Sequence, residues 1–178
     1  MSKVLIVVDM QNDFVRGSLA NPAAAAIIPF IESEIKSGKY SRVLFTQDTH
    51  YGDYLNTQEG RKLPIEHCQL DTWGWEIVDE LKQYKTGDNY ICKHVFGFLN
   101  WNDVWNDMVA DVVPDDVDEI VLVGTCTDIC VVSNAMILRT TFTEKEITVL
   151  AQGCAGLTEE KHKAAIDVME SCLINVVR

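Results

Sequence analysis

The sequence has little positive charge. Its 178 residues include 15 Lys and Arg against 27 Asp and Glu, which gives a formal net charge of -12. Proteins that bind nucleic acid or an anionic membrane surface need clustered Lys and Arg. The charge balance therefore argues against nucleic acid and membrane surfaces as partners.

Long apolar runs and paired cysteine motifs are also absent. The apolar run at 4–8 is too short for the core of a signal peptide or for a transmembrane helix, and no later run is long enough to span a bilayer. The six cysteines include no C-x-x-C pair, which excludes zinc-ribbon and thioredoxin motifs. Several cysteines lie in apolar runs, as reduced thiols do in cytosolic proteins. We therefore expect a cytoplasmic protein.

No repeat, low-complexity segment or linker divides the chain, and its length suits one domain, so we expect a single domain over 1–178. Apolar, strand-like runs alternate with helical patterns. The expected strands are 4–8, 43–46, 90–92, 120–123, 147–150 and 174–177. The expected helices are 22–37, 75–84, 101–112, 130–142 and 158–172. This alternation predicts an α/β fold of three layers, with a six-stranded, mostly parallel sheet flanked by helices.

Three expected strands lead to side chains that nucleophilic catalysis can use. Strand 4–8 ends at Asp9, strand 90–92 ends at Lys93, and a sharp turn after the fourth strand leads to Cys130. Carboxyl ends of parallel strands lie along one edge, so the three residues can converge. A carboxylate can accept the thiol proton, while an ammonium and a helix beginning at Cys130 lower the pKa of the thiol. Each residue also has an ordinary structural explanation: Asp9 as the cap of a turn, Lys93 as a solvated charge and Cys130 as a core thiol.

A second polar group follows the strand at 43–46 and extends into the long polar segment 51–72. It consists of Asp48, His50, Glu59 and His67. Two imidazoles and two carboxylates suit Zn²⁺, Fe²⁺ or Mn²⁺. Loop acids and histidines are often only solvated, so the spacing leaves both interpretations open. We interpret the other two histidines, His94 and His162, as structural or surface residues.

Four sequence elements, all in the same order, resemble those of the isochorismatase-like cysteine hydrolases and, within them, the nicotinamidases. They are Asp9-Met10-Gln11-Asn12-Asp13-Phe14, Thr46-Gln47-Asp48-Thr49-His50, Lys93, and Gly124-x-x-Thr127-Asp128-x-Cys130-Val131. The resemblance covers essentially the whole chain and implies a six-stranded parallel sheet flanked by helices. It also implies a catalytic triad of Asp9, Lys93 and Cys130, in a cytoplasmic hydrolase of NAD metabolism.

The resemblance further implies a non-proline cis peptide just before the nucleophile turn. By position it falls between Thr125 and Cys126. Its role would be to aim the N–H of Cys126 beside that of Cys130, so that the two form an oxyanion hole for the tetrahedral intermediate. Cys126 would then act through its backbone and not through its thiol.

A divalent metal is also implied, with Zn²⁺ as the first candidate and Fe²⁺ or Mn²⁺ as the alternatives. Its ligands would be Asp48, His50, Glu59 and His67. In the family, such a metal binds the pyridine nitrogen of nicotinamide, and Phe14 and Phe98 are the corresponding substrate-binding residues here. The chain departs from the family pattern in 64–72 and in 94–98, where the segment after Lys93 is about one residue shorter. These departures put the identity of the substrate in doubt.

The leading hypothesis is an amidase that hydrolyses a small aromatic or heteroaromatic amide, first of all nicotinamide, to the acid and ammonia. One alternative is a metal-free relative that acts on another amide, a ureide or a vinyl ether. Another is a non-enzymatic binding or redox-sensing protein that uses Cys126 and Cys130 as a thiol pair. Relatives are often oligomers, and the apolar helix at 128–142 is the candidate contact of a homo-oligomer.

Overall fold

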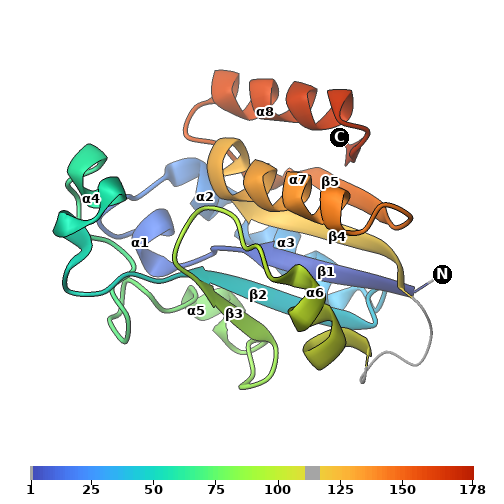
Figure 1. The fold of residues 1–178 in the computed structure, drawn as a ribbon, viewed down its shortest axis with the longest axis horizontal. Helices are drawn as coiled ribbons and strands as arrows, with labels where there is room; N and C mark the ends of the chain where they lie inside the picture. Colours follow the sequence, from blue (N-terminus) through green and yellow to red (C-terminus); the bar gives the residue numbers. More distant parts are fainter. Residues whose placement is uncertain (1, 111–116) are drawn as a thin grey trace.

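Six parallel strands form a single sheet in the order β3-β2-β1-β4-β5-β6 in the computed structural model, which describes residues 2–110 and 117–178 (Figure 1). The strands are β1 (Ser2–Val8), β2 (Arg42–Asp48), β3 (Tyr90–Lys93), β4 (Val117–Thr125), β5 (Glu146–Ala155) and β6 (Asn175–Val177). Every neighbouring pair is parallel. The predicted six-stranded α/β fold is therefore confirmed.

The described helices are shorter than the sequence patterns suggest. They are α1 (Asn12–Val15), α2 (Pro22–Ala26), α3 (Ile28–Lys36), α4 (Gln58–Lys62), α5 (Asp79–Lys82), α6 (Trp101–Val104), α7 (Val132–Thr141) and α8 (Glu159–Ser171). Three further helical turns accompany them: η1 (Tyr54–Asn56), η2 (Trp105–Ala110) and η3 (Thr127–Val131). None of the described helices combines the length and the apolar character that crossing a bilayer requires.

The central strands are buried on both faces, which explains their continuous apolar runs. Val4, Ile6 and Val8 of β1 face one layer, made by α6, α7 and α8. Leu5 and Val7 face the opposite layer, made by α2, α3 and α5. The sheet is thus the middle of three layers, and the carboxyl ends of its strands point to the side of the molecule where α1 and α4 lie (Figure 1).

Two predicted helices differ from the structure for identifiable reasons, and a third is described only in part. The helix expected at 22–37 divides into α2 and α3, because Pro29 near the start of α3 has no N–H to donate to the preceding turn. The helix expected at 75–84 is reduced to α5, because the preceding residues bond to the segment after β1, where the Asn12 N–H donates to the Glu76 carbonyl. For the helix expected at 101–112, the last two residues lie outside the described part of the chain.

Gly124 is the point where β4 turns toward the nucleophile. Its φ is 125°, a backbone conformation that residues with a Cβ rarely adopt. A Cβ at this position would also lie 2.1 Å from the carbonyl oxygen of Val8. Glycine therefore allows β4 to pass close to β1, so that the residues after both strands meet at one edge.

Candidate active site

The structure brings Asp9, Lys93 and Cys130 together at the carboxyl edge of the sheet. The Lys93 ammonium nitrogen lies 2.7 Å from Asp9 Oδ2 and 3.7 Å from Cys130 Sγ. All three side chains are buried, although the chain separates them by many residues. One cation between a carboxylate and a thiol is an arrangement that can hold and move a proton.

Asp9 follows β1 directly, in a left-handed conformation with φ of 49°. This sharp turn at the strand end places its carboxylate beside β2, where the Thr46 hydroxyl donates to Asp9 Oδ1 over 2.6 Å. Burial raises the pKa of Asp9; the Lys93 ammonium opposes this shift and the Asp48 carboxylate adds to it. A carboxylate with a raised pKa is a better proton acceptor than an ordinary aspartate, as a general base must be.

Lys93 is the last residue of β3 and is only 1% exposed. Its ammonium also lies 3.3 Å from Asp48 Oδ1 and donates to the Val95 carbonyl oxygen over 3.2 Å. Burial alone would lower the pKa of Lys93, but the Asp9 and Asp48 carboxylates raise it well above its usual value. The side chain therefore stays protonated and acts as a fixed positive charge.

Cys130 does not begin a helix, as the sequence suggested, but lies within η3, which begins at Thr127 and leads into α7. Its environment also differs from the expectation. Burial raises the pKa of the Cys130 thiol well above its usual value; Lys93 opposes this shift, while the carboxylates of Asp9 and Asp48 add to it. The resting thiol is therefore neutral, which makes a nearby proton acceptor necessary for any nucleophilic role.

A cis peptide bond joins Thr125 and Cys126, at the position that the family resemblance implies. The Thr125 hydroxyl donates to the Ala155 carbonyl oxygen over 3.1 Å, which ties this bond to the end of β5. The Cys126 carbonyl oxygen accepts the N–H groups of Ile129 and Val131 and so closes η3. The turn that carries Cys130 is thus fixed at both ends.

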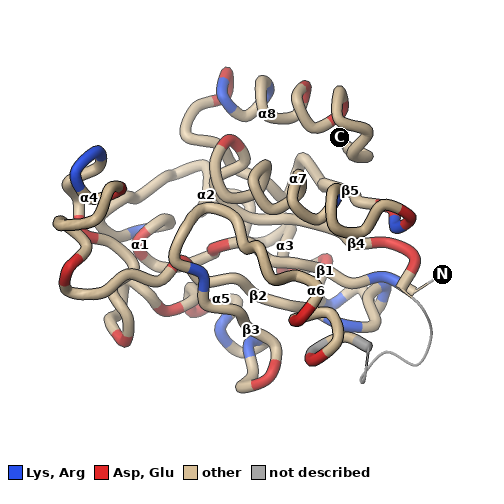
Figure 2. The backbone as a smooth tube through the Cα atoms, viewed as in Figure 1, with Lys and Arg blue, Asp and Glu red and all other residues tan. Residues whose placement is uncertain are grey.

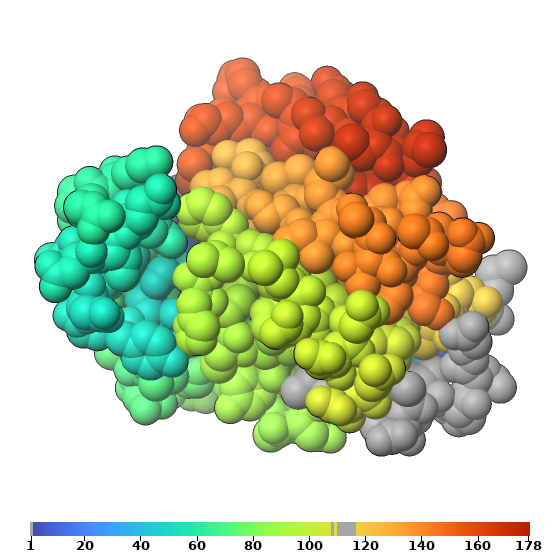
Figure 3. Space-filling view, in the orientation of Figure 1, coloured from blue at the N-terminus to red at the C-terminus, as the bar shows by residue number. Residues whose placement is uncertain are grey.

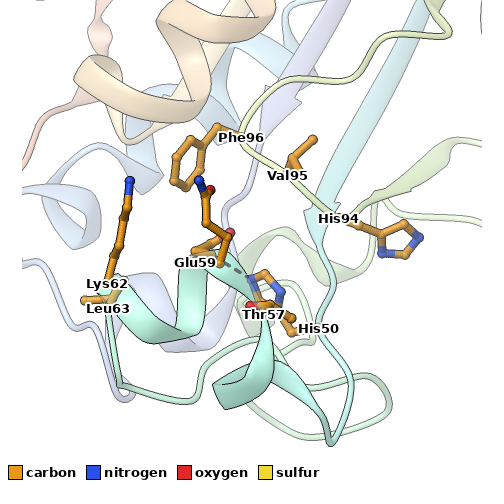
Figure 4. Close-up of a pocket in the computed structure, with 9 residues that line it drawn as sticks. His50, Thr57, Glu59, Lys62, Leu63, His94, Val95 and Phe96 are labelled. Atoms are coloured by element: carbon orange, nitrogen blue, oxygen red, sulfur yellow. Dashed lines mark ion pairs between the residues drawn. The ribbon is translucent and has the colours of Figure 1, made fainter.

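Asp48, His50, Glu59 and His67 form a second cluster beside these residues. Asp48 ends β2 and Glu59 lies on α4. His50 belongs to the segment between β2 and η1, and His67 to the segment after α4. The His50 Nε2 lies 3.2 Å from Asp48 Oδ2 and 3.7 Å from Glu59 Oε1. The His67 Nε2 lies 3.7 Å and 3.8 Å from the same two oxygens. Figure 4 shows Glu59 reaching down from α4 toward His50.

This cluster fits a divalent metal. Its four ligand atoms all lie within 4.8 Å of one another, and a tetrahedral ion with bonds of ~2.1 Å holds its ligands about 3.4 Å apart. Glu59 Oε1 is buried and makes no hydrogen bond with the described residues, so it has an unused acceptor. The His67 Nδ1 is 2.8 Å from the Ile65 carbonyl oxygen, a contact that fixes the ring and leaves Nε2 for the cluster.

One carboxylate serves both clusters. Oδ1 of Asp48 faces Lys93, while Oδ2 faces the two histidines. Burial would raise the pKa of Asp48, but Lys93 and the two imidazoles outweigh it and hold the pKa well below its usual range. Sequence reasoning assigned Asp48 to the metal alone and missed this second contact.

A cavity of about 170 Å³, here called the inner cavity, lies between the two clusters. Residues predicted from the sequence that line it are Phe14, Asp48, Glu59, His67, Cys126 and Cys130. Five apolar lining residues were not predicted: Leu19, Leu63, Phe96, Ile129 and Leu157. They come from separate segments of the chain, so no local motif marks them, although the exposed apolar character of Phe96 and Leu157 is a signal in the structure.

Phe98, the second substrate-binding residue implied by the resemblance, does not line the inner cavity. Its ring packs edge-on against Trp101, with ring centroids 5.4 Å apart, and its N–H donates to Asn134 Oδ1. Gly97 causes this arrangement, because it packs so closely on α7 that a Cβ would lie 2.5 Å from Ile137 Cδ1. The segment therefore turns Phe98 toward the core and Phe96 toward the cavity.

The remaining two histidines each have a structural partner. The His94 Nδ1 lies 3.0 Å from the Thr49 carbonyl oxygen, and the His162 Nδ1 lies 2.8 Å from the Thr127 hydroxyl. Neither belongs to the metal cluster. The first contact joins the segment after β3 to the segment after β2, and the second joins α8 to the start of η3.

Comparison with known proteins gives consistent results. The Isochorismatase domain family model matches residues 3–178. The nicotinamidase of Saccharomyces cerevisiae is 30% identical over an alignment of 178 residues, which covers 75% of this chain and 80% of the yeast protein.

Solved structures show the same fold. The nicotinamidase/pyrazinamidase of Bacillus subtilis matches with a TM-score of 0.78 at 24% identity, over 100% of both chains. The pyrazinamidase of Pyrococcus horikoshii in complex with zinc matches with a TM-score of 0.78 at 23% identity, over 100% of this chain and 99% of the other.

Proposed function

The chain belongs to the isochorismatase family, and on that basis we propose that it is a cysteine-dependent amidohydrolase of a small heteroaromatic amide. Nicotinamide, hydrolysed to nicotinate and ammonia, is the first candidate, because the relative that is 30% identical is a nicotinamidase. The observation that carries the proposal is that Asp9, Lys93 and Cys130 meet beside a metal-binding cluster. The inner cavity between them has room for about one ring.

The first half of the reaction forms a thioester. Asp9 accepts the proton of the Cys130 thiol, and the sulfur attacks the amide carbon. Lys93 stabilises the thiolate by its charge. The N–H groups of Cys126 and Cys130 stabilise the oxyanion, at roughly 3 kcal/mol for each donor. As the carbon–nitrogen bond breaks, protonated Asp9 returns its proton to the leaving nitrogen, and ammonia departs.

The second half of the reaction releases the acid. Asp9, again a carboxylate, accepts a proton from a water molecule, and the resulting hydroxide attacks the thioester carbon. The carbon–sulfur bond then breaks, the acid leaves, and protonated Asp9 returns its proton to the Cys130 sulfur. Asp9 thus accepts and returns a proton twice in one cycle, which suits a buried carboxylate whose pKa is raised by burial and restrained by Lys93.

Asp48, His50, Glu59 and His67 would hold the divalent metal, for which Zn²⁺ is the first candidate and Fe²⁺ or Mn²⁺ are the alternatives. When bound, the metal would supply a Lewis acid that binds the pyridine nitrogen and orients the ring. Phe14, whose ring centroid lies 5.7 Å from that of His67, would pack against the substrate ring.

Ammonia release from a panel of small amides tests the proposal. We expect nicotinamide and pyrazinamide to be hydrolysed by the zinc-loaded protein, and benzamide, which has no ring nitrogen, to be hydrolysed at least about tenfold more slowly. A chelator should remove most of the activity on nicotinamide. Full activity of the metal-stripped protein would instead support the metal-free alternative, and inertness to all amides would contradict an amidase.

Glu59→Gln should weaken zinc binding roughly 10²-fold, because an amide oxygen is a poorer ligand than the carboxylate it replaces. Isothermal titration of the metal-stripped protein with Zn²⁺ measures this without any substrate. Glu66→Gln is the matched control, since Glu66 is exposed next to His67 and lies outside the cluster. Equal affinities of the two variants would exclude Glu59 as a ligand.

A further inference from the structure

A second and larger cavity adjoins the inner one. This outer cavity, of about 510 Å³, is lined by residues of α4, by His50 and by the segment after β3 (Figure 4). The two cavities share three lining residues, Glu59, Leu63 and Phe96. In the space-filling view a groove separates the surface of α4 from that of the segment after β3 (Figure 3). A molecule in the inner cavity therefore has an open volume next to it.

Phe96 is the most exposed of the three residues that the two cavities share. Asn134 fixes the backbone on both sides of Gly97, because its amide donates to the Phe96 carbonyl oxygen and accepts the Phe98 N–H. Phe96 is nevertheless 44% exposed, and its ring stacks on no other aromatic ring among the described residues. Its side chain can thus swing between rotamers while the backbone stays in place.

The outer cavity also carries a cation that makes no ion pair with the described residues. Lys62 lines it from the last turn of α4 and forms no ion pair with the residues that the structure describes. The basic end of α4 stands out in a molecule with a net charge of -12 (Figure 2). In Figure 4 the Lys62 side chain extends from α4 toward the segment that carries Phe96. The carboxylate that also lines this cavity, that of Glu59, belongs to the metal cluster.

From this geometry we infer that the outer cavity binds an anionic substituent on the ring of the substrate. The inference rests on the proposed function, since the amide and its ring would occupy the inner cavity. The substrate class is then a heteroaromatic amide whose ring carries a carboxylate-bearing side chain. Phe96 admits the side chain past the shared wall, and Lys62 pairs with its charge.

Three amides test this inference in the zinc-loaded protein: nicotinamide, nicotinamide with a carboxyethyl group meta to the carboxamide, and the same compound with a neutral hydroxypropyl group. We expect kcat/KM to be about fivefold higher for the carboxyethyl compound than for the hydroxypropyl compound, because one partly exposed ion pair supplies that much. Lys62→Gln should bring this ratio close to one. Arg61→Gln removes the same charge from the same helix outside the cavity and should leave the ratio unchanged.

Phe96→Trp puts a larger side chain between the inner and the outer cavity and should narrow the passage that joins them. It should therefore lower kcat/KM for both substituted amides about tenfold relative to nicotinamide. Hydrolysis of nicotinamide with no measurable hydrolysis of either substituted amide would overturn the inference and leave the proposed function intact. A charge preference that survives Lys62→Gln would also overturn it. Absence of ammonia from all three compounds would instead reject the amidase proposal itself.

Discussion

Cys130→Ala should abolish amide hydrolysis, with a loss of at least about 10⁴-fold in kcat, because in the proposed mechanism the Cys130 sulfur forms the thioester. The thiol lies 3.7 Å from the Lys93 ammonium and opens onto the inner cavity. The substitution removes one buried sulfur atom, so the free energy of unfolding should fall by only about 1 kcal/mol. Ammonia release under saturating nicotinamide and thermal unfolding of the same sample measure the two effects separately.

Cys126→Ala is the matched control for this experiment. Cys126 also lines the inner cavity, but in the proposed mechanism it contributes only its backbone N–H, which alanine keeps. We expect Cys126→Ala to retain activity within about fivefold of the parent protein, since it deletes only a packing atom. Comparable loss in both variants would contradict the separate roles of the two cysteines, and substantial activity in Cys130→Ala would reject the thioester mechanism.

The parts of the site that lie at strand ends could be predicted from the sequence. Strands buried on both faces read as apolar runs, so the polar residues that end them, Asp9, Asp48 and Lys93, stand out in the chain. Because the carboxyl ends of parallel strands share one edge of a sheet, the order of the strands is enough to group these residues. The sequence therefore places the candidate residues at one edge, but not the contacts among them.

Those contacts depend on strand register, which the sequence does not contain. Asp48 and Lys93 are register partners in the pairing of β2 with β3, and this places the metal-cluster carboxylate beside the lysine. The pKa of Cys130 is a second example. The expected helix terminus would lower it, whereas burial, which depends on packing by the whole α7 side of the sheet, raises it. Phe96 lines the inner cavity and Phe98 does not, for a similar reason, because Gly97 packs closely on α7.

Lys93→Met should cost both activity and stability. The ammonium lies between the buried carboxylates of Asp9 and Asp48, at 2.7 Å and 3.3 Å. Its removal leaves Asp9 without its ion-pair partner and Asp48 with only the two imidazoles of the metal cluster, and breaking a buried pair in this way typically costs about 3–5 kcal/mol. Activity on nicotinamide should fall by about 10²–10⁴-fold, because neither the thiolate nor the base retains its electrostatic support.

The stability loss should depend on pH in a defined direction. In the parent protein the raised pKa of Lys93 means that its contribution is complete below about pH 10 and is lost only as the pH rises through that raised value. The lowered pKa of Asp48 gives stability above about pH 4 that is lost as the pH falls. In Lys93→Met the pKa values of both acids rise, because each loses its contact with the ammonium. Both carboxylates therefore carry less negative charge at low pH, and the penalty shrinks. Urea unfolding of metal-stripped protein at about pH 7.5 and pH 4.5 should therefore show the larger difference between parent and variant at the higher pH.

Lys85→Met provides the comparison that isolates the buried pairing. Lys85 lies 3.9 Å from the centroid of the Tyr90 ring and, like Lys93, carries a partly desolvated charge, but it forms no ion pair with a described carboxylate. Its replacement should cost only about 1 kcal/mol, with little change between the two pH values. The double variant Lys93→Met with Asp48→Asn should recover part of the loss at the higher pH, because it removes one of the two unpaired charges. A loss of stability that is equal at both pH values and is not relieved by Asp48→Asn would mean that Lys93 stabilises the site by packing. That result would contradict the electrostatic role proposed for Lys93 in catalysis.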